Sequence, residues 1–271
     1  MKKIAILIGV LILALGLVGC GSTKKEEPKT DGKVVIKVGA TPVPHAEILN
    51  HIKPLLAKEG VELQIIEFND YVKPNMATAD KEIDANFFQH TPYFDKFIAD
   101  RGLKLTNAAA IHIEPMGIYS KKVKSLTEIA DGSVVTVPND PSNGGRALAV
   151  LEKAGLIKLK AGVGINGTPR DIVENPKNLK IKEVEAPQLP RSLDDVAISV
   201  INTNFALEAK LNPKKDSLFM EPKDSPYVNI LVVRAGDEKR PEIKKLINAL
   251  KSPEVKIFIE EKYQGAIAPA F

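Results

Sequence analysis

The alternation of strand-like and helix-like segments is the feature that most constrains the fold of this chain. Short apolar segments, rich in β-branched residues, are followed by amphipathic segments that begin near a proline or end near a glycine. Strands are predicted at residues 34–38, 61–68 and 83–87, and helices at residues 44–58, 74–79 and 91–102. Thr91 and Pro92 are the expected cap and first residue of the third helix. Strands joined in this way form right-handed crossovers, so the region predicts a parallel sheet.

The same pattern starts again further along the chain. Ser125 to Glu128 has the spacing of a capping box at the start of a helix. Further strands are predicted at residues 133–137, 196–201 and 229–233, with helices at 145–154, near Phe205, at 241–250, and at 253–263 after a Ser252 cap. We therefore expect two α/β units, with the C-terminal helices packing back on the first. Two facing units leave a cleft beyond the carboxyl ends of their strands, which hinge closure can bury.

The first residues have the pattern of an address and a membrane anchor. Lys2 and Lys3 precede an apolar run at residues 4–18, which is shorter than the roughly 20 residues that span a membrane. The run ends in Leu17-Val18-Gly19-Cys20, which resembles a bacterial lipobox. We expect a signal peptide over residues 1–19, a lipid on Cys20 and a flexible tether over residues 20–33. An ordinary secretory signal or an anchor helix is the alternative.

Cysteine content and charge exclude several classes of protein. Cys20 is the only cysteine, so neither a disulfide framework nor a cysteine metal site can form. Two of the residues behind the net charge of +4 are Lys2 and Lys3, and the rest is too nearly neutral to favour a nucleic-acid partner. The four histidines are spread without metal-ligand spacing, and His45 and His51 are expected on a helix face without a ligand role. We find no catalytic motif and expect neither enzymatic activity nor a cofactor.

Polar and aromatic residues gather after the ends of the predicted strands. They are Asn69 to Tyr71, Asn86 to His90 with Tyr93, His112 to Pro115, the segment 139–146, Asn202 and Asn229. Within them, Asn143-Gly144-Gly145-Arg146 could bind a carboxylate, because the glycines allow close backbone approach and free N–H groups would lie beside a guanidinium. A plain helix start with an exposed arginine is the alternative. Glu114 could pair with an ammonium group, and the aromatic residues could line a pocket or simply pack in a core.

Long segments of the chain resemble the methionine-binding lipoproteins of methionine ABC importers, the NlpA lipoprotein family. The segments that carry the resemblance are VGATPVPHAEIL (38–49), EFNDYVKPN (67–75), IDANFFQHTPYFD (83–95), HIEPMGIYSKKVKSL (112–126), VPNDPSNGGRAL (137–148), ENPKNLKI (174–181), APQLPRSLDD (186–195), VINTNFA (200–206) and SPYVNILVVR (225–234). The resemblance implies an α/β, two-lobe periplasmic-binding-protein fold, type II-like, with two crossover strands and a ligand cleft between the lobes. Lobe 1 would comprise residues 34–113 and 228–271, and lobe 2 residues 114–227. Ser142 departs from the threonine expected there but keeps a hydroxyl.

The resemblance also implies a division of labour among the candidate residues. Arg146 and Asn143 would hold the carboxylate of the ligand, and Glu114, Asn202 and Asn229 would fix its amino group. The residues expected around a thioether are Tyr71, Phe88, His90, Tyr93 and His112.

The implied partners are methionine, an ABC permease with its ATPase, and the membrane through the lipid on Cys20. The protein would act as a monomer on the extracytoplasmic face of the cell membrane. Two alternatives stay open: a receptor for another amino acid or a methionine-containing dipeptide, and a surface lipoprotein that acts as an adhesin or structural element.

Overall fold

A computed structural model describes residues 33–222 and 225–271 of the chain. The predicted signal peptide, the lipid site at Cys20 and most of the predicted tether lie outside these residues. Among the helices of the described part, none is both long and apolar enough to cross a membrane.

The first of two main sheets has six strands in the order β13-β4-β12-β3-β1-β2. The strands are β1 (Val34–Ala40), β2 (Val61–Glu67), β3 (Ala85–His90), β4 (Leu105–Ile113), β12 (Val228–Arg234) and β13 (Ala268–Pro269). The predicted parallel pairing holds for β1 with β2 and with β3, whereas β12 runs antiparallel to both β3 and β4. The sheet is therefore mixed, because β12 enters it on the return from the second half of the molecule.

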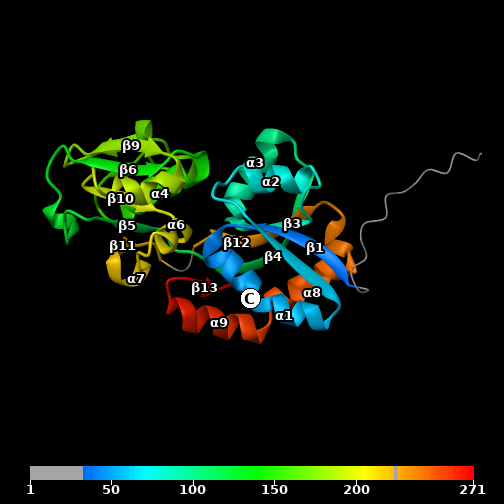
Figure 1. The fold of residues 1–271 in the computed structure, drawn as a ribbon. Coiled ribbons are helices and arrows are strands. Elements are labelled where there is room, and N and C mark those ends of the chain that lie inside the picture. The colour runs from blue at the N-terminus through cyan, green and yellow to red at the C-terminus, as the bar shows by residue number, and fades with distance from the viewer. Residues whose placement is uncertain (1–32, 223–224) are drawn as a thin grey trace, which may run out of the picture.

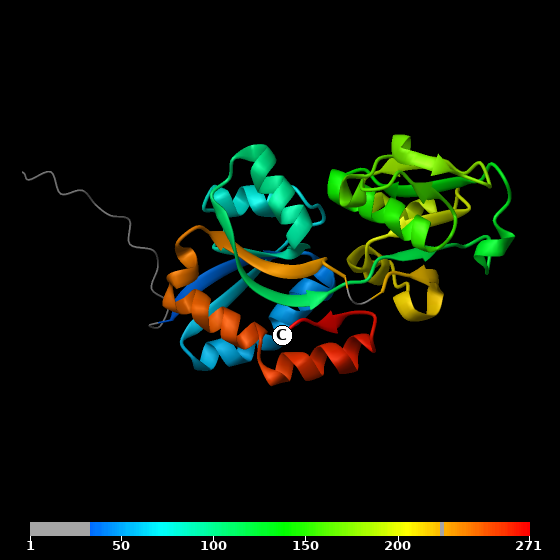
Figure 2. The same cartoon turned by 180° about the vertical axis from the view of Figure 1, so that it is seen from behind.

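Helices cover both faces of this sheet (Figures 1 and 2). They are α1 (Glu47–Lys58), α2 (Lys73–Ala79), α3 (Thr91–Arg101), α8 (Pro241–Leu250) and α9 (Pro253–Tyr263), with short turns η1 (Pro42–Ala46) and η6 (Asp237–Lys239). Helices α8 and α9 pack against α1, as predicted, and α2 and α3 lie on the opposite face. Ile243 and Ile259 from the two C-terminal helices join Ile36 and Leu49 in one apolar core.

The second main sheet has five strands in the order β11-β5-β10-β6-β9. These are β5 (Gly117–Tyr119), β6 (Val134–Pro138), β9 (Lys180–Val184), β10 (Ile198–Ile201) and β11 (Ser217–Met220), with a small separate pair of β7 (Lys158–Leu159) and β8 (Ile172–Glu174). Its helices are α4 (Pro141–Lys153), α5 (Leu189–Ser192), α6 (Thr203–Glu208) and α7 (Pro213–Asp216), with turns η2 (Leu126–Glu128), η3 (Gly164–Asn166), η4 (Pro169–Asp171) and η5 (Ala186–Gln188). A separate apolar core forms around Leu148, Val135 and Val200.

The two sheets and their helices form two bodies that lie side by side (Figures 1 and 2). We call the body around the six-stranded sheet lobe 1 and the body around the five-stranded sheet lobe 2. The chain leaves lobe 1 after β4 and returns to it through β12. This is the α/β two-lobe fold expected from the resemblance. We propose that the lobes divide after residues 113 and 227.

Three local predictions are corrected by the structure. Ser125 caps only the single short turn η2, and the Glu128 carboxylate accepts a hydrogen bond from Lys124 N instead of closing a capping box. His90, not Thr91, caps α3, because its Nδ1 accepts from Tyr93 N at 3.1 Å. Helix α4 begins at Pro141 behind an Asp140 cap, four residues earlier than expected.

Candidate ligand-binding pocket

A cavity of about 330 Å³ lies between the lobes, near the lower end of the size range of small-molecule sites. Its wall is built from the ends of strands, the loops that follow them and the first turns of α4 and α6. The lining residues are Tyr71, Phe88, Gln89, His90, Tyr93, Glu114, Asn143, Arg146, Asn202, Thr203, Asn204 and Asn229. Nine of the ten ligand residues expected from the sequence are among them, and His112 is the exception.

Glu114 supplies the acidic group of the pocket and is hydrogen-bonded from behind. Its Oε1 lies 2.7 Å from His112 Nε2 and 3.2 Å from His45 Nε2. His112 is fully buried behind Glu114, and so is His45, which the sequence placed on a helix face without a role. Burial lowers the pKa of His45 to about 4 and that of His112 to about 3. At neutral pH each imidazole is therefore neutral and can donate one N–H.

The surroundings fix which nitrogen of His45 carries the proton. Its Nε2 faces two acceptors, Glu114 Oε1 and Asn229 Oδ1, the latter at 3.1 Å. Nε2 must therefore be the donor, and Nδ1 accepts a hydrogen bond from the Thr41 hydroxyl at 2.7 Å. Burial raises the pKa of Glu114, and the positive charge of Arg146 opposes this rise.

His45, His112 and Glu114 also have the atom types of a metal site, with ligand atoms within 4.8 Å of one another. A metal would require both Nε2 atoms to be unprotonated and about 2.0–2.1 Å from the ion. The 2.7 Å separation of His112 Nε2 from Glu114 Oε1 is instead that of a charge-assisted hydrogen bond. We interpret His112 and Glu114 as a hydrogen-bonded pair, with His45 beside them donating to Asn229.

Arg146 supplies the basic group of the pocket from the first turns of α4. It is buried, and its guanidinium donates through Nε and Nη2 to Glu221 Oε2 and through Nη2 to the Glu114 carbonyl oxygen. The guanidinium also lies 4.0 Å above the ring of Tyr227. Among the described residues, none accepts a hydrogen bond from Nη1. Arg146 is thus held in place by the segments that connect the lobes, with one nitrogen left for a ligand.

The two glycines before Arg146 have a different role from the one expected. Both lie inside α4, where Asp140 caps the helix and Gly144 N donates to Asp140 O. The expectation of free N–H groups is therefore wrong. A Cβ on Gly145 would lie 2.0 Å from Ile165 O, and one on Gly144 would lie 3.0 Å from Pro138 O. The glycines let other parts of this chain approach α4.

Asn143 orients its neighbours across the cleft. Its Oδ1 accepts from Asn202 Nδ2 at 2.8 Å and from His90 Nε2 at 3.0 Å. Its Nδ2 donates to both carboxylate oxygens of Asp140 at 3.0 Å. Burial, together with the charge of Arg146, lowers the pKa of His90 to about 3, so that imidazole is a neutral donor. These bonds join α4 to the end of β3 in lobe 1 and to Asn202 in lobe 2.

Two buried amide groups in the pocket lack partners among the described residues. They are Asn202 Oδ1, an acceptor, and Asn204 Nδ2, a donor. Buried polar atoms are normally hydrogen-bonded, and an unmatched one costs about 1–3 kcal/mol. A ligand that offers a donor to Asn202 and an acceptor to Asn204 would satisfy both.

The remaining wall is aromatic. The rings of Tyr71, Phe88 and Tyr93 lie 5.8–6.1 Å apart between centroids. Tyr93 donates its hydroxyl to Tyr71 O at 2.7 Å, and Tyr71 donates to Asn204 Oδ1 at 2.6 Å. Because both hydroxyls are engaged, the rings present apolar surface. The Tyr71–Asn204 and His90–Asn143 bonds join lobe 1 to lobe 2, so the lobes are closed on the cavity.

Sequence reasoning missed several residues that shape this pocket. Gln89 and Asn204 lie inside segments already singled out, so alternation along those strand ends could have found them. Thr41 and His45 follow the end of β1, and the rule applied to the second and third strands would have found them there. Glu221 follows β11, a strand that the sequence did not indicate.

The sequence matches a known protein family and close relatives within it. The family model described as NlpA lipoprotein matches residues 36–271. The D-methionine-binding lipoprotein MetQ of Salmonella typhimurium is 50% identical over 252 residues, which cover 92% of this chain and 90% of the relative.

Solved structures of similar proteins have the same fold. A nutrient binding protein from Burkholderia cenocepacia bound to methionine has a TM-score of 0.85 and 49% identity, covering 87% of this chain and all of that one. A periplasmic substrate-binding protein of an ABC transporter from Coxiella burnetii has a TM-score of 0.83 and 44% identity, with the same coverage.

Proposed function

The chain belongs to the NlpA lipoprotein family, and we propose that it is the substrate-binding lipoprotein of an ABC importer that binds methionine between its lobes and delivers it to the permease. The observation that carries the proposal is the composition of one buried cavity. It has an acidic end at Glu114, a basic end at Arg146 and an aromatic wall. A zwitterionic amino acid with an apolar side chain has matching parts.

The head group of the ligand fits the unmatched atoms of the pocket. The ammonium group would donate to the Glu114 carboxylate and to Asn202 Oδ1, which lacks a partner among the described residues. The carboxylate would accept from Arg146 Nη1 and from Asn204 Nδ2. Asn229, which shares His45 with Glu114, would complete the ammonium site. Asn143 and His90 would act by orienting the others, and His112 by supporting Glu114, not by contacting the thioether as first expected.

The side chain of methionine fits the aromatic wall. Burying it would contribute about 1.5–3 kcal/mol. Sulfur against the rings of Tyr71, Phe88 or Tyr93 would add about 0.3–1.5 kcal/mol. Norleucine keeps the shape and loses the sulfur, so we expect it to bind about 2- to 10-fold more weakly.

Placement at the membrane completes the proposal. A lipid on Cys20 would anchor the protein at the extracytoplasmic face of the cell membrane, and the receptor would act as a monomer beside the permease and its ATPase. Binding and release need no chemical turnover, so the proposed role is not enzymatic. Two acyl chains contribute about 0.8 kcal/mol per buried CH₂, which is enough for durable attachment.

A thermal-shift panel on ligand-stripped protein tests the cargo. Methionine should raise the unfolding midpoint most, norleucine less, and alanine little because it loses the apolar contribution. Glutamate should fail because its second charge would be desolvated. If another amino acid or a methionine-containing dipeptide raised the midpoint and methionine did not, the assignment of methionine as the cargo would be wrong. No shift with any of them would favour an adhesin or structural lipoprotein instead.

A further inference from the structure

We infer that His45 and His112 are positioning residues that hold the Glu114 carboxylate in place for the ammonium group of the ligand. The inference deepens the proposed function and rests on it for the identity of the ligand. Neither histidine lines the cavity, so neither would be found by asking which side chains touch the ligand. Both act through Glu114.

The geometry places the three side chains on separate elements that converge at one carboxylate oxygen. His45 comes from η1, His112 from the end of β4, and Glu114 from the segment that leaves lobe 1. Both histidines are fully buried, and Glu114 is 6% exposed. The imidazole of His45 packs edge-on against Phe87 at 4.6 Å and beside His112 at 5.0 Å between ring centroids. A change of tautomer would remove the Nε2 donor, and a change of ring orientation would break the Thr41 bond and these contacts.

The His45 imidazole contacts both residues that are proposed to bind the ammonium group, Glu114 and Asn229. His45 Nε2 lies 3.2 Å from Glu114 Oε1 and 3.1 Å from Asn229 Oδ1. It therefore fixes the spacing between the carboxylate and the amide oxygen that would share the ammonium group. His112 adds the shorter bond of 2.7 Å to the same carboxylate oxygen. His112 donates a hydrogen bond to Glu114, whereas His45 donates to Asn229 and lies in contact with the same Glu114 oxygen. Neutral imidazoles orient an anion without cancelling its charge, whereas a lysine or arginine at either position would compete with the ligand.

The charge of Glu114 depends on these donors. Burial favours its protonated form, which would lose the charge that attracts an ammonium group. The ionisable groups that face Glu114 are His45, His112 and Arg146. Its charge also acts on Tyr71 in the loop after β2 and on Tyr263 in α9. Hydrogen bonds to the carboxylate favour the ionised form, so removing an N–H donor should raise the pKa of Glu114 further.

The test compares His112→Leu, which removes the donor, with His112→Gln, which returns an N–H near the same place. Calorimetry with methionine is run between pH 5.5 and 8.0, a range in which His45 and His112 stay neutral. The wild-type profile is the reference, because burial already raises the pKa of Glu114. His112→Leu should bind at least about tenfold more weakly at pH 5.5 and recover as the pH rises, because Glu114 regains its charge. His112→Gln should restore most of the affinity and the wild-type profile.

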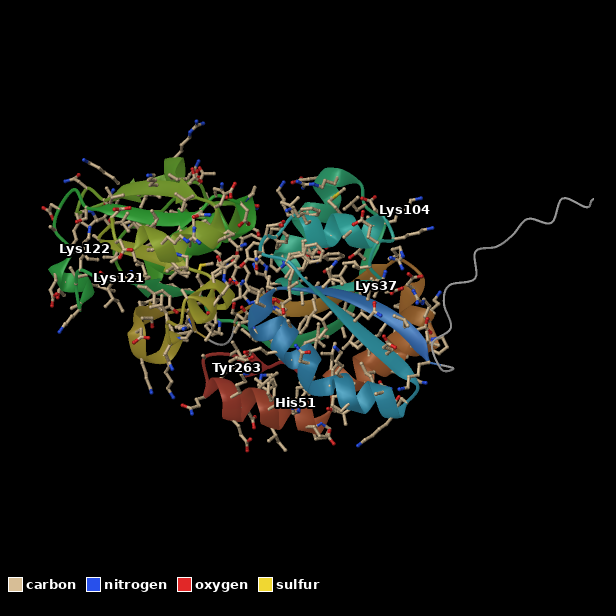
Figure 3. All side chains as sticks on the ribbon, in the orientation of Figure 1. Lys37, His51, Lys104, Lys121, Lys122 and Tyr263 are labelled. Carbon is tan, nitrogen blue, oxygen red and sulfur yellow. The ribbon has the colours of Figure 1, made fainter. Side chains whose placement is uncertain are left out.

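His51→Gln is the matched control. His51 is an exposed histidine on α1 that stacks on Phe258 at 4.2 Å, away from the cavity (Figure 3). Its replacement should change neither the affinity nor the pH profile.

A second readout needs no ligand. Carbon-13 NMR of labelled glutamate carboxyls, with Glu114 assigned by its loss in Glu114→Gln, follows the titration directly. Glu114 should titrate at a higher pH in His112→Leu than in the wild type. An unchanged titration, or an affinity loss in His112→Leu that is equal at every pH, would overturn the inference. A wild-type protein that does not bind methionine would overturn the proposed function instead, and the NMR titration would still decide the role of the histidines.

Discussion

At the scale of single residues, Arg146 combines ligand binding with a structural role. Its guanidinium neutralises Glu221, a side chain that is 6% exposed and also accepts a hydrogen bond from Met116 N. Replacing Arg146 by alanine would leave the Glu221 charge buried and unpaired, at a cost of about 3–5 kcal/mol. The loss of a ligand bond and the loss of stability must therefore be separated.

Two variants separate the loss of binding from the loss of stability. One is Arg146→Ala, and the other combines Arg146→Ala with Glu221→Gln. Both variants should bind methionine at least about tenfold to a hundredfold more weakly, because the carboxylate loses a charged donor. The second should recover much of the free energy of unfolding, since the unpaired charge is gone. Urea denaturation and calorimetry measure the two quantities. Wild-type affinity in the double variant would remove Arg146 from the ligand site.

Single residues also show how much of the site could be predicted from the sequence. The rule that polar residues gather after strand ends found Glu114, Arg146 and Asn202, which line the cavity. It did not distinguish a residue that lines the cavity from one that supports it, as with His112. That difference depends on side-chain direction and on tertiary contacts between η1, β4 and the connecting segment, which sequence spacing does not contain.

At the scale of elements, helix α4 depends on a close backbone contact. Gly145 meets the main chain of η3, and a Cβ there would lie 2.0 Å from Ile165 O and 2.6 Å from Ile165 C. Alanine in a helix is favoured over glycine by up to about 1 kcal/mol. Overpacking a tight contact costs about 1–3 kcal/mol, and a backbone atom cannot rotate away as a side chain can. We expect the steric cost to exceed the gain in helix propensity.

Gly145→Ala should therefore lower the free energy of unfolding by about 1–2 kcal/mol. Gly144→Ala should cost less, because its Cβ would meet a single atom, Pro138 O, at 3.0 Å. Denaturant midpoints of the two variants test the order. A more stable Gly145→Ala protein would mean that η3 moves away from α4 without loss.

Element boundaries were predicted well where a local signal exists. Ser252 caps α9 and Gly102 ends α3, as expected, and the structure shows Gly102 in the left-handed conformation. The start of α4 was missed because Asp140 and Pro141 form a cap and first residue inside a segment interpreted as a loop. The antiparallel entry of β12 was missed because pairing between distant strands depends on topology, which local periodicity does not determine.

At the scale of the whole molecule, three buried neutral histidines make stability depend on pH. The pKa values of His45, His90 and His112 fall to about 4, 3 and 3 in the folded protein, below the ordinary 6.5. Between these values the unfolded chain binds more protons than the folded one, so stability is full above pH 6.5 and falls as the pH is lowered. Glu114 and Asp140, whose pKa values are raised by burial, have the opposite slope.

His90→Gln isolates one of these contributions. The slope of the unfolding free energy between pH 6 and pH 4 should fall by about 1.4 kcal/mol per pH unit relative to the wild type. Urea denaturation at several pH values measures it. An unchanged slope would mean that His90 is charged in the folded protein.

Calorimetric titration of methionine into ligand-stripped protein, beside the Glu114→Gln variant, tests whether methionine binds in the cavity between the lobes. The wild type should bind one methionine per chain and saturate, and Glu114→Gln should bind at least about tenfold more weakly because the ammonium group loses its counter-charge. A wild-type protein that takes up no methionine, or a Glu114→Gln protein that binds it equally well, would contradict the placement of methionine in the cavity between the lobes.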